Sequence, residues 1–158
     1  MKLYFVRHGR ASQIATTDSA RPLLPDGETQ ARNMGKVLKM LDVQAARVFS
    51  SPRVRALQTA QIIGQALGKE PIVRDACNFD FNVHQAFQLI HGLDDDAEVL
   101  FVGHNPSMSE IVTDLTGANV ELSTGAIACV TQIFPPSASG AILKWLITPK
   151  LVNAILEA

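Results

Sequence analysis

Two apolar segments, each followed by a histidine, constrain the fold of this chain more than any other feature. The first is Leu3–Val6, which leads into Arg7-His8-Gly9, and the second is Val99–Val102, which leads into Gly103-His104. Short, continuous apolar runs are typical of strands buried on both faces, as in a parallel sheet. If the two strands are parallel neighbours, both imidazoles emerge at the carboxyl edge, where open α/β sheets bind ligands. The sequence therefore predicts a ligand site built around His8 and His104.

Length and composition predict one ordinary domain over residues 1–158. With 158 residues, 47% of them hydrophobic, the chain can bury a core without disulfide bonds or metals. Its two cysteines, Cys77 and Cys129, belong to no CxxC pair, so we expect them to be buried and reduced, as in the cytoplasm. No apolar run is long enough to span a membrane, and a net charge of −1 without a basic block argues against a nucleic-acid partner. We expect a cytoplasmic monomer.

The order of elements predicts an α/β fold, a three-layer αβα sandwich with a mostly parallel central sheet. Strand-like runs at 2–6, 47–50 and 99–103 alternate with helical patterns. The runs 126–134 and 141–148 are separated by only Pro-Pro-Ser-Ala-Ser-Gly, too short for a helical crossover, so they are expected to form a C-terminal antiparallel hairpin. Helices are expected over 28–41, 52–67 with Ser51 as the cap, 82–92, and 106–116 with Asn105 as the cap.

Two arginines stand in the opening turn of the helix expected after Ser51-Pro52. The amino end of a helix offers free N–H groups, and a guanidinium adds a planar fork of donors that matches phosphate oxygens. Arg55 would therefore complete an anion pocket with Arg7, His8 and His104. Arg53 is interpreted as a solvated surface residue.

Three motifs in order carry a resemblance to a known family. Arg7-His8-Gly9, then Ser50-Ser51-Pro52 with Arg55-Ala56 and Gln58-Thr59-Ala60, then Gly103-His104-Asn105-Pro106 resemble the motifs of the histidine phosphatase superfamily, which includes phosphoglycerate mutases and acid phosphatases. The chain is further similar to the short SixA-type phosphohistidine phosphatases. That similarity extends over nearly the whole chain, through Asp18–Leu23 with Asp26-Gly27, Ser123–Ala128 and Trp145–Ile155.

The resemblance implies a mechanism and a set of site residues. His8 would attack phosphorus and become transiently phosphorylated, with its ring oriented by a backbone carbonyl, expected from Gly9. Arg7, Arg55 and His104 would hold the phosphoryl oxygens, with Arg21 and Gly9 as further substrate contacts. No cofactor and no metal are expected, since His84 and His91 lack a third ligand.

The lack of room for an inserted segment over the site bears on the kind of substrate that we expect. Larger members of the superfamily use an acidic residue, often from an insertion over the site, to protonate the leaving oxygen. Here the span from Leu67 to Glu98 is too short for a large insertion, and the available acids Asp18, Asp75 and Asp80 match no motif. Imidazole, with a reference pKa near 6.5, leaves far more readily than an alkoxide. We therefore expect the substrate to be a phosphohistidine on a partner protein, such as a signalling or phosphotransfer domain.

Two alternatives remain open at this point. The chain could be a small-molecule phosphomonoester phosphatase with Asp75 or Asp80 as the acid, or a phosphate- or phosphopeptide-binding module without turnover. A cysteine phosphatase is excluded because neither cysteine has an arginine six residues on, and a P-loop enzyme is disfavoured because GxxxxGK[ST] is absent. Transient phosphorylation of His8 would separate the enzyme from the binding module.

Overall fold

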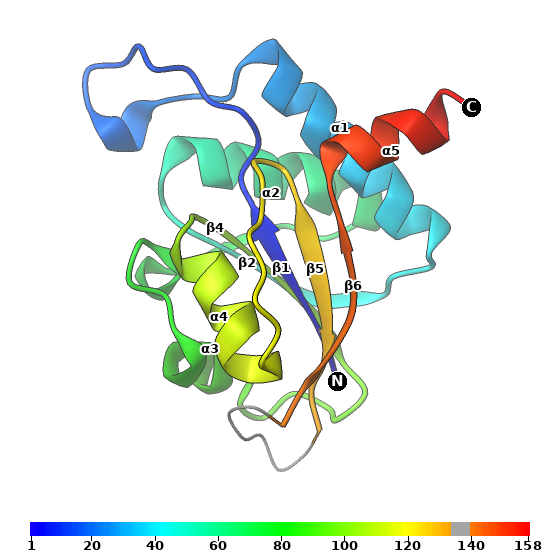
Figure 1. Cartoon of the computed structure of the whole chain (residues 1–158). Coiled ribbons are helices and arrows are strands. Elements are labelled where there is room, and N and C mark those ends of the chain that lie inside the picture. Colours follow the sequence, from blue (N-terminus) through cyan, green and yellow to red (C-terminus); the bar gives the residue numbers. More distant parts are fainter. Residues whose placement is uncertain (134–139) are drawn as a thin grey trace.

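A six-stranded sheet between two layers of helices forms the body of the molecule in the computed structural model, which describes residues 1–133 and 140–158 (Figure 1). Helices α3 and α4 cover one face of the sheet, and α1, α2 and α5 cover the other. The elements are β1 (Lys2–Arg7), η1 (Asp18–Ala20), α1 (Pro25–Met40), β2 (Ala45–Ser50), α2 (Val54–Leu67), β3 (Ile72–Val73), η2 (Asp75–Cys77), α3 (Val83–Ile90), β4 (Glu98–Gly103), α4 (Ser107–Thr116), β5 (Ile127–Thr131), β6 (Ile142–Ile147) and α5 (Pro149–Leu156).

The strand order is β3-β2-β4-β1-β5-β6, and the first four strands run parallel. β5 pairs antiparallel with β1, and β6 pairs antiparallel with β5. The predicted mostly parallel sheet and the C-terminal hairpin are therefore confirmed. Most of the Pro-Pro-Ser-Ala-Ser-Gly turn, together with Phe134 at the end of the expected strand, lies outside the described residues.

Between their end residues, β1 and β4 are apolar because each strand faces a helical layer on both sides. On β1, Leu3 and Phe5 join the core beneath α3 and α4, whereas Tyr4 and Val6 join the core beneath α1 and α2. The residues of β4 alternate in the same way along their length. This two-residue period, buried on both faces, is what the continuous hydrophobic runs predicted.

The carboxyl ends of β1, β2 and β4 meet at one edge of the sheet. Arg7 lies opposite Gly103 and Ser50 lies opposite Val102 in the two parallel ladders. The ladder continues one step further, because the His8 N–H donates to the Gly103 carbonyl at 3.0 Å. The predicted common edge for both histidine-bearing loops is confirmed.

Four helices begin at other residues than the sequence predicted, and for α3 the shift is from 82 to Val83. α1 starts at Pro25, whereas the sequence predicted a start at 28. Gly27 lies in its first turn, where a Cβ would come 2.0 Å from the Arg10 carbonyl oxygen. α2 starts at Val54 with Arg53 at the N-cap, and α4 starts at Ser107 with Pro106 at the N-cap. The expected cap Ser51 contacts a histidine instead, as described below. None of the helices in the described part of the chain is long and apolar enough to cross a membrane.

Candidate active site

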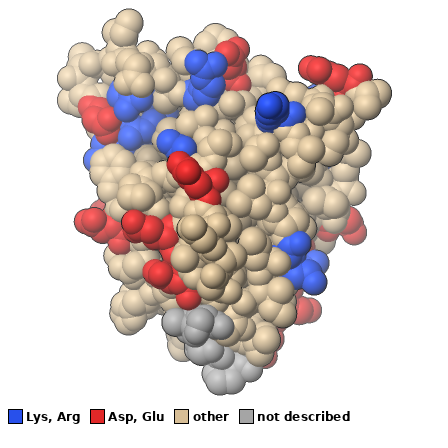
Figure 2. Space-filling view, viewed as in Figure 1, with Lys and Arg blue, Asp and Glu red and all other residues tan. Residues whose placement is uncertain are grey.

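A cleft of about 460 Å³ opens at the carboxyl edge of β1 and β4, and basic side chains gather toward this end of the molecule (Figure 2). It is bordered by the loop that follows β1, by the start of α2 and by the loop between η2 and α3. Among the described residues no aspartate or glutamate lines it. The lining residues are Arg7, His8, Arg10, Ala11, Gln13, Arg21, Leu24, Arg55, Phe79, His104, Asn105 and Thr124.

His8 presents an unprotonated ring nitrogen to this cleft. Its Nδ1 lies 2.7 Å from the Gly9 carbonyl oxygen, the partner that the sequence predicted. Because a carbonyl oxygen can only accept, Nδ1 is the donor. The proton is thereby held on Nδ1, and the lone pair of Nε2 accepts from Arg55 Nε at 3.3 Å. Burial lowers the pKa of His8 to about 4; the Gly9 hydrogen bond opposes that shift, and the charges of Arg55 and Arg7 add to it. The ring is neutral at neutral pH and is a competent nucleophile.

His104 is fixed by a hydroxyl that the sequence assigned to a helix cap. Its Nε2 lies 2.7 Å from Ser51 Oγ, and Ser51 Oγ also accepts from the Arg53 N–H at 3.2 Å. Within the described residues Nε2 is the only acceptor that the Ser51 hydroxyl has, so we assign the hydroxyl hydrogen to Nε2, which leaves the His104 proton on Nδ1. Burial, followed by the charge of His8, lowers the pKa of His104 to about 3. His104 is a neutral donor whose ring centroid lies 5.3 Å from that of His8.

Two buried donors of the site lack a hydrogen-bond partner within the described residues. They are His104 Nδ1 and Arg7 Nε, and Arg7 also donates from Nη1 to the Leu122 carbonyl at 2.9 Å. An unpaired buried donor costs about 1–3 kcal/mol, so folded proteins retain few of them without a functional reason. Tetrahedral oxyanions supply the acceptor oxygens that such a group of donors requires.

Asp18 in η1 gathers three arginines at the rim of the cleft. Its carboxylate pairs with Arg21, Arg53 and Arg55, and its backbone carbonyl accepts from Arg55 Nη1 at 2.9 Å. Hydrogen bonds from Arg21 and Arg55 hold the pKa of Asp18 below its usual value. The group stays ionised, so it orients cations and is poorly suited to donate a proton.

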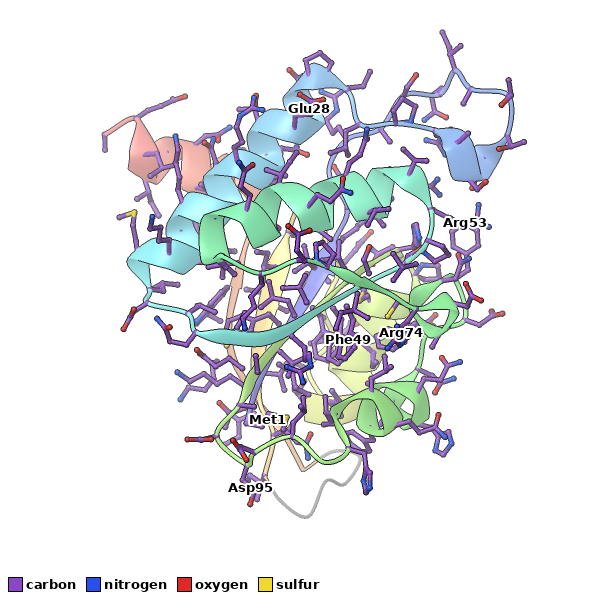
Figure 3. All side chains as sticks on the ribbon, turned by 180° about the vertical axis from the view of Figure 1, so that it is seen from behind. Met1, Glu28, Phe49, Arg53, Arg74 and Asp95 are labelled. Atoms are coloured by element: carbon purple, nitrogen blue, oxygen red, sulfur yellow. The ribbon has the colours of Figure 1, made fainter. Side chains whose placement is uncertain are left out.

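The expectation of a solvated Arg53 is wrong. Its guanidinium pairs with Asp18, donates from Nε to Asn78 Oδ1 at 2.8 Å, and lies over the Phe79 ring at 4.0 Å. Figure 3 shows Arg53 at the start of α2, next to the loop that carries η1. The partners lie 25 to 35 residues away along the chain, which is why local sequence could not reveal them.

Of the two further substrate contacts that the sequence predicted, Arg21 lies in the cleft wall and Gly9 does not. Arg21 lines the cleft and donates from Nε to the Ser12 carbonyl at 2.7 Å. The Gly9 carbonyl accepts from the His8 ring, and the Gly9 N–H is already bonded to Thr59 Oγ1 at 3.1 Å. Thr59 in turn donates to the Arg55 carbonyl at 2.8 Å, which ties the His8 loop to α2. Gly9 thus contacts His8 and does not line the cleft.

The other candidate acids are not in the cleft. Asp75 begins η2 and Asp80 follows it, but neither residue lines the cleft that contains His8. Across the described ranges, no three His, Cys, Asp or Glu side chains are grouped as a metal ion would require. The geometry therefore offers cationic and neutral hydrogen-bond donors around an unprotonated imidazole.

The two buried histidines should make stability fall in mild acid. The unfolded chain takes up protons on these rings near pH 6.5, whereas the folded chain does so only near pH 4 and pH 3. Stability is then fully present above about pH 7 and falls as the pH drops from about 6.5 toward the folded-state pKa values of about 4 and 3, by at most about 2–3 kcal/mol per pH unit for two protons. Urea unfolding at pH 7.5, 6.5 and 5 measures this slope. His8→Gln should flatten it by about half, and a slope of zero in the wild type would contradict both depressed pKa values.

Comparison with known proteins supports the class indicated by this fold and its paired histidines, the histidine phosphatases. Residues 3–78 match the model of the histidine phosphatase superfamily (branch 1). The chain belongs to the histidine phosphatase superfamily, and it is a phosphatase of that superfamily.

Within the superfamily the chain is similar to SixA proteins. Phosphohistidine phosphatase SixA of Escherichia coli (strain K12) is 30% identical over 98% of this chain and 100% of that protein. The SixA homolog of Haemophilus influenzae is 30% identical over 78% of this chain and 82% of its own. The solved structure of the protein histidine phosphatase SixA complexed with tungstate matches with a TM-score of 0.85 at 29% identity, covering 95% of this chain and 98% of that one.

Proposed function

We propose that this protein hydrolyses phosphohistidine on a partner protein through a phosphorylated His8. The observation that carries the proposal is the lone pair of His8 Nε2, held beside Arg55 in a cleft lined by cations and by no carboxylate among the described residues. The name of its E. coli relative, phosphohistidine phosphatase, supports the same substrate class.

In the first step, the lone pair of His8 Nε2 attacks phosphorus and the P–N bond to the substrate imidazole breaks. The electron pair of that bond leaves with the imidazole nitrogen, which takes a proton from solvent. Arg7, Arg55 and the Nδ1–H of His104 stabilise the phosphoryl oxygens, because their positive charges and donors are in place before the charge develops. The Gly9 carbonyl stabilises the positive charge that forms on the His8 ring.

In the second step, a water oxygen attacks the phosphorus of phospho-His8. The bond from His8 Nε2 to phosphorus breaks, the lone pair returns to the ring, and a proton passes from the water to solvent as phosphate is released. Arg21 is proposed as a further substrate contact, since it lies in the cleft wall and is oriented by Asp18.

The proposal also covers the conditions of the reaction. Metal independence is supported by the arginines, which supply the positive charge that a metal would otherwise provide. Every group used comes from one chain, so we propose that the protein acts as a monomer. The buried free thiols of Cys77 and Cys129 fit a reducing compartment, which supports a cytoplasmic location.

The choice of leaving group tests the function. Phosphohistidine on a protein should be turned over rapidly, aryl phosphates with acidic phenols more slowly, and alkyl phosphates about 10²–10⁴-fold more slowly, the factor that a general acid would supply. The measurement is kcat/KM across this series, with EDTA present and absent. Asp75→Asn and Asp80→Asn serve as matched variants, each expected to leave the series within about threefold of the wild type.

Two results would contradict the proposal. A flat dependence on the leaving group, with a large loss in Asp75→Asn or Asp80→Asn, would indicate a small-ester phosphatase with a general acid. Tight binding of phosphohistidine without release of phosphate would indicate a binding module.

A further inference from the structure

Phe79, in the loop between η2 and α3, is a large apolar side chain in a cleft otherwise rich in cations. It is 43% exposed and lines the same cleft as His8, Arg55 and His104. Within residues 1–133 and 140–158 it is the only Phe, Tyr or Trp that does so. The proposed hydrolysis, as written above, makes no use of this ring.

The ring is held in place from several sides. The guanidinium carbon of Arg53 lies 4.0 Å from the Phe79 ring centroid, a cation–π contact. Asn78 Oδ1 accepts both from the Phe79 N–H at 3.0 Å and from Arg53 Nε at 2.8 Å, so one amide oxygen fixes the ring's backbone and the cation over its face. A preorganised ring loses little conformational entropy when a ligand packs against it.

Phe79 also lies close to two of the proposed phosphate-binding groups, His104 and Arg55. Its centroid is 4.8 Å from that of His104, with the planes at 62°, and 5.9 Å from the guanidinium carbon of Arg55. In an in-line transfer the leaving group departs on the side of phosphorus opposite His8 Nε2. Phe79 shares the cleft with His8 and is the aromatic side chain available there to a planar leaving group, and aromatic rings attract one another at centroid separations of roughly 4.5–7 Å.

We propose that Phe79, held by Arg53 and Asn78, forms a subsite for the leaving group that selects a planar aromatic ring, the imidazole of phosphohistidine. The inference rests on the proposed function and deepens it, because it assigns recognition of the substrate's side chain to a residue outside the phosphate-binding groups. The exposed part of the phenyl ring becomes covered when an imidazole packs against it, and a substrate without a ring gains nothing from this contact.

The test compares two P–N substrates that differ in the ring. Free phosphohistidine has an imidazole leaving group, whereas phosphoramidate has ammonia and no ring. Phe79→Leu keeps an apolar side chain of similar size without aromaticity, and Phe79→Tyr keeps the ring. We expect Phe79→Leu to lower kcat/KM for phosphohistidine about two- to twelvefold, mainly through KM, because one aromatic pair contributes that much. Phosphoramidate should stay within about twofold, and Phe79→Tyr should match the wild type on both substrates.

Two outcomes would overturn the subsite. Equal losses on both substrates would mean that Phe79 acts by positioning Arg53 or His104, and no loss on phosphohistidine would mean that the ring is not contacted. Failure of the proposed function would look different: the wild type would leave phosphohistidine intact while hydrolysing esters. In that case phenyl phosphate against acetyl phosphate reports on the ring preference in the same variants.

Discussion

His8→Ala should abolish turnover, with a loss on the order of 10⁶-fold, comparable to removal of the nucleophile from other covalent mechanisms. No neighbouring group can substitute for its Nε2. His104 is turned toward Ser51, and the arginines remain protonated and carry no lone pair to donate. Any residual rate would come from the donors of the cleft acting on a water molecule.

The fold should survive this change. Among the described residues, the His8 side chain bonds only to the carbonyl of its neighbour Gly9 and to Arg55, which keeps two other hydrogen bonds to Asp18. Its removal therefore leaves one guanidinium N–H without its partner at the edge of an open cleft, a cost of about 1–2 kcal/mol. A urea unfolding curve should show that small shift and no change in cooperativity.

Acid quenching during turnover of labelled substrate measures the chemistry directly. The wild type should retain acid-labile, alkali-stable phosphate on one histidine, and His8→Ala should retain none. His84→Ala is the matched control, since His84 is an exposed histidine on α3 outside the cleft, and it should keep both rate and label. Label on another residue, or turnover in His8→Ala, would contradict the assignment of the nucleophile.

The sheet and its two histidine-bearing loops were predictable because their cause is local. A run such as Leu3–Val6 alternates between two buried faces, and the residue after it must leave the sheet at its carboxyl edge. Once β1 and β4 pair in parallel, His8 and His104 have no freedom to lie apart. The carbonyl that orients His8 was predictable for the same reason, because it belongs to the next residue.

The groups around the two histidines were not predictable from local pattern. Ser51 has the right chemistry for a helix cap, but its hydroxyl is bonded to His104, 53 residues further on. Arg53 is the N-cap residue of α2, where a solvated side chain was expected, yet Asp18 and Asn78 hold it at the cleft. Phe79 carried no signal at all. Such contacts depend on how the segments that follow four different strands converge, which a periodicity of two or 3.6 residues does not encode.

Arg55→Ala should lower kcat/KM by about 10²–10³-fold, the usual loss when one preorganised donor is removed from a transition-state site. Arg55 is 4% exposed, and its Nε donates at 3.3 Å to His8 Nε2, the nitrogen that we propose attacks phosphorus. Its two Nη atoms are bonded to Asp18, which fixes the plane of the guanidinium. The variant should fold, because Asp18 keeps Arg21 and Arg53 as partners and is not left with an unpaired charge.

Arg55→Lys separates charge from geometry. A lysine keeps the positive charge but presents a single ammonium, which cannot reach His8 Nε2 and both Asp18 oxygens at once. We therefore expect it to recover only part of the loss. Arg10→Ala is the comparison for charge alone, because Arg10 borders the same cleft but is exposed and paired with Asp26, so its removal should cost less than about threefold through screened electrostatics. If Arg10→Ala and Arg55→Ala lost activity equally, the cleft would act through its summed positive charge, and the hydrogen bond from Arg55 to the nucleophile would carry no special weight. A near-normal rate in Arg55→Ala would place the phosphoryl group elsewhere in the cleft.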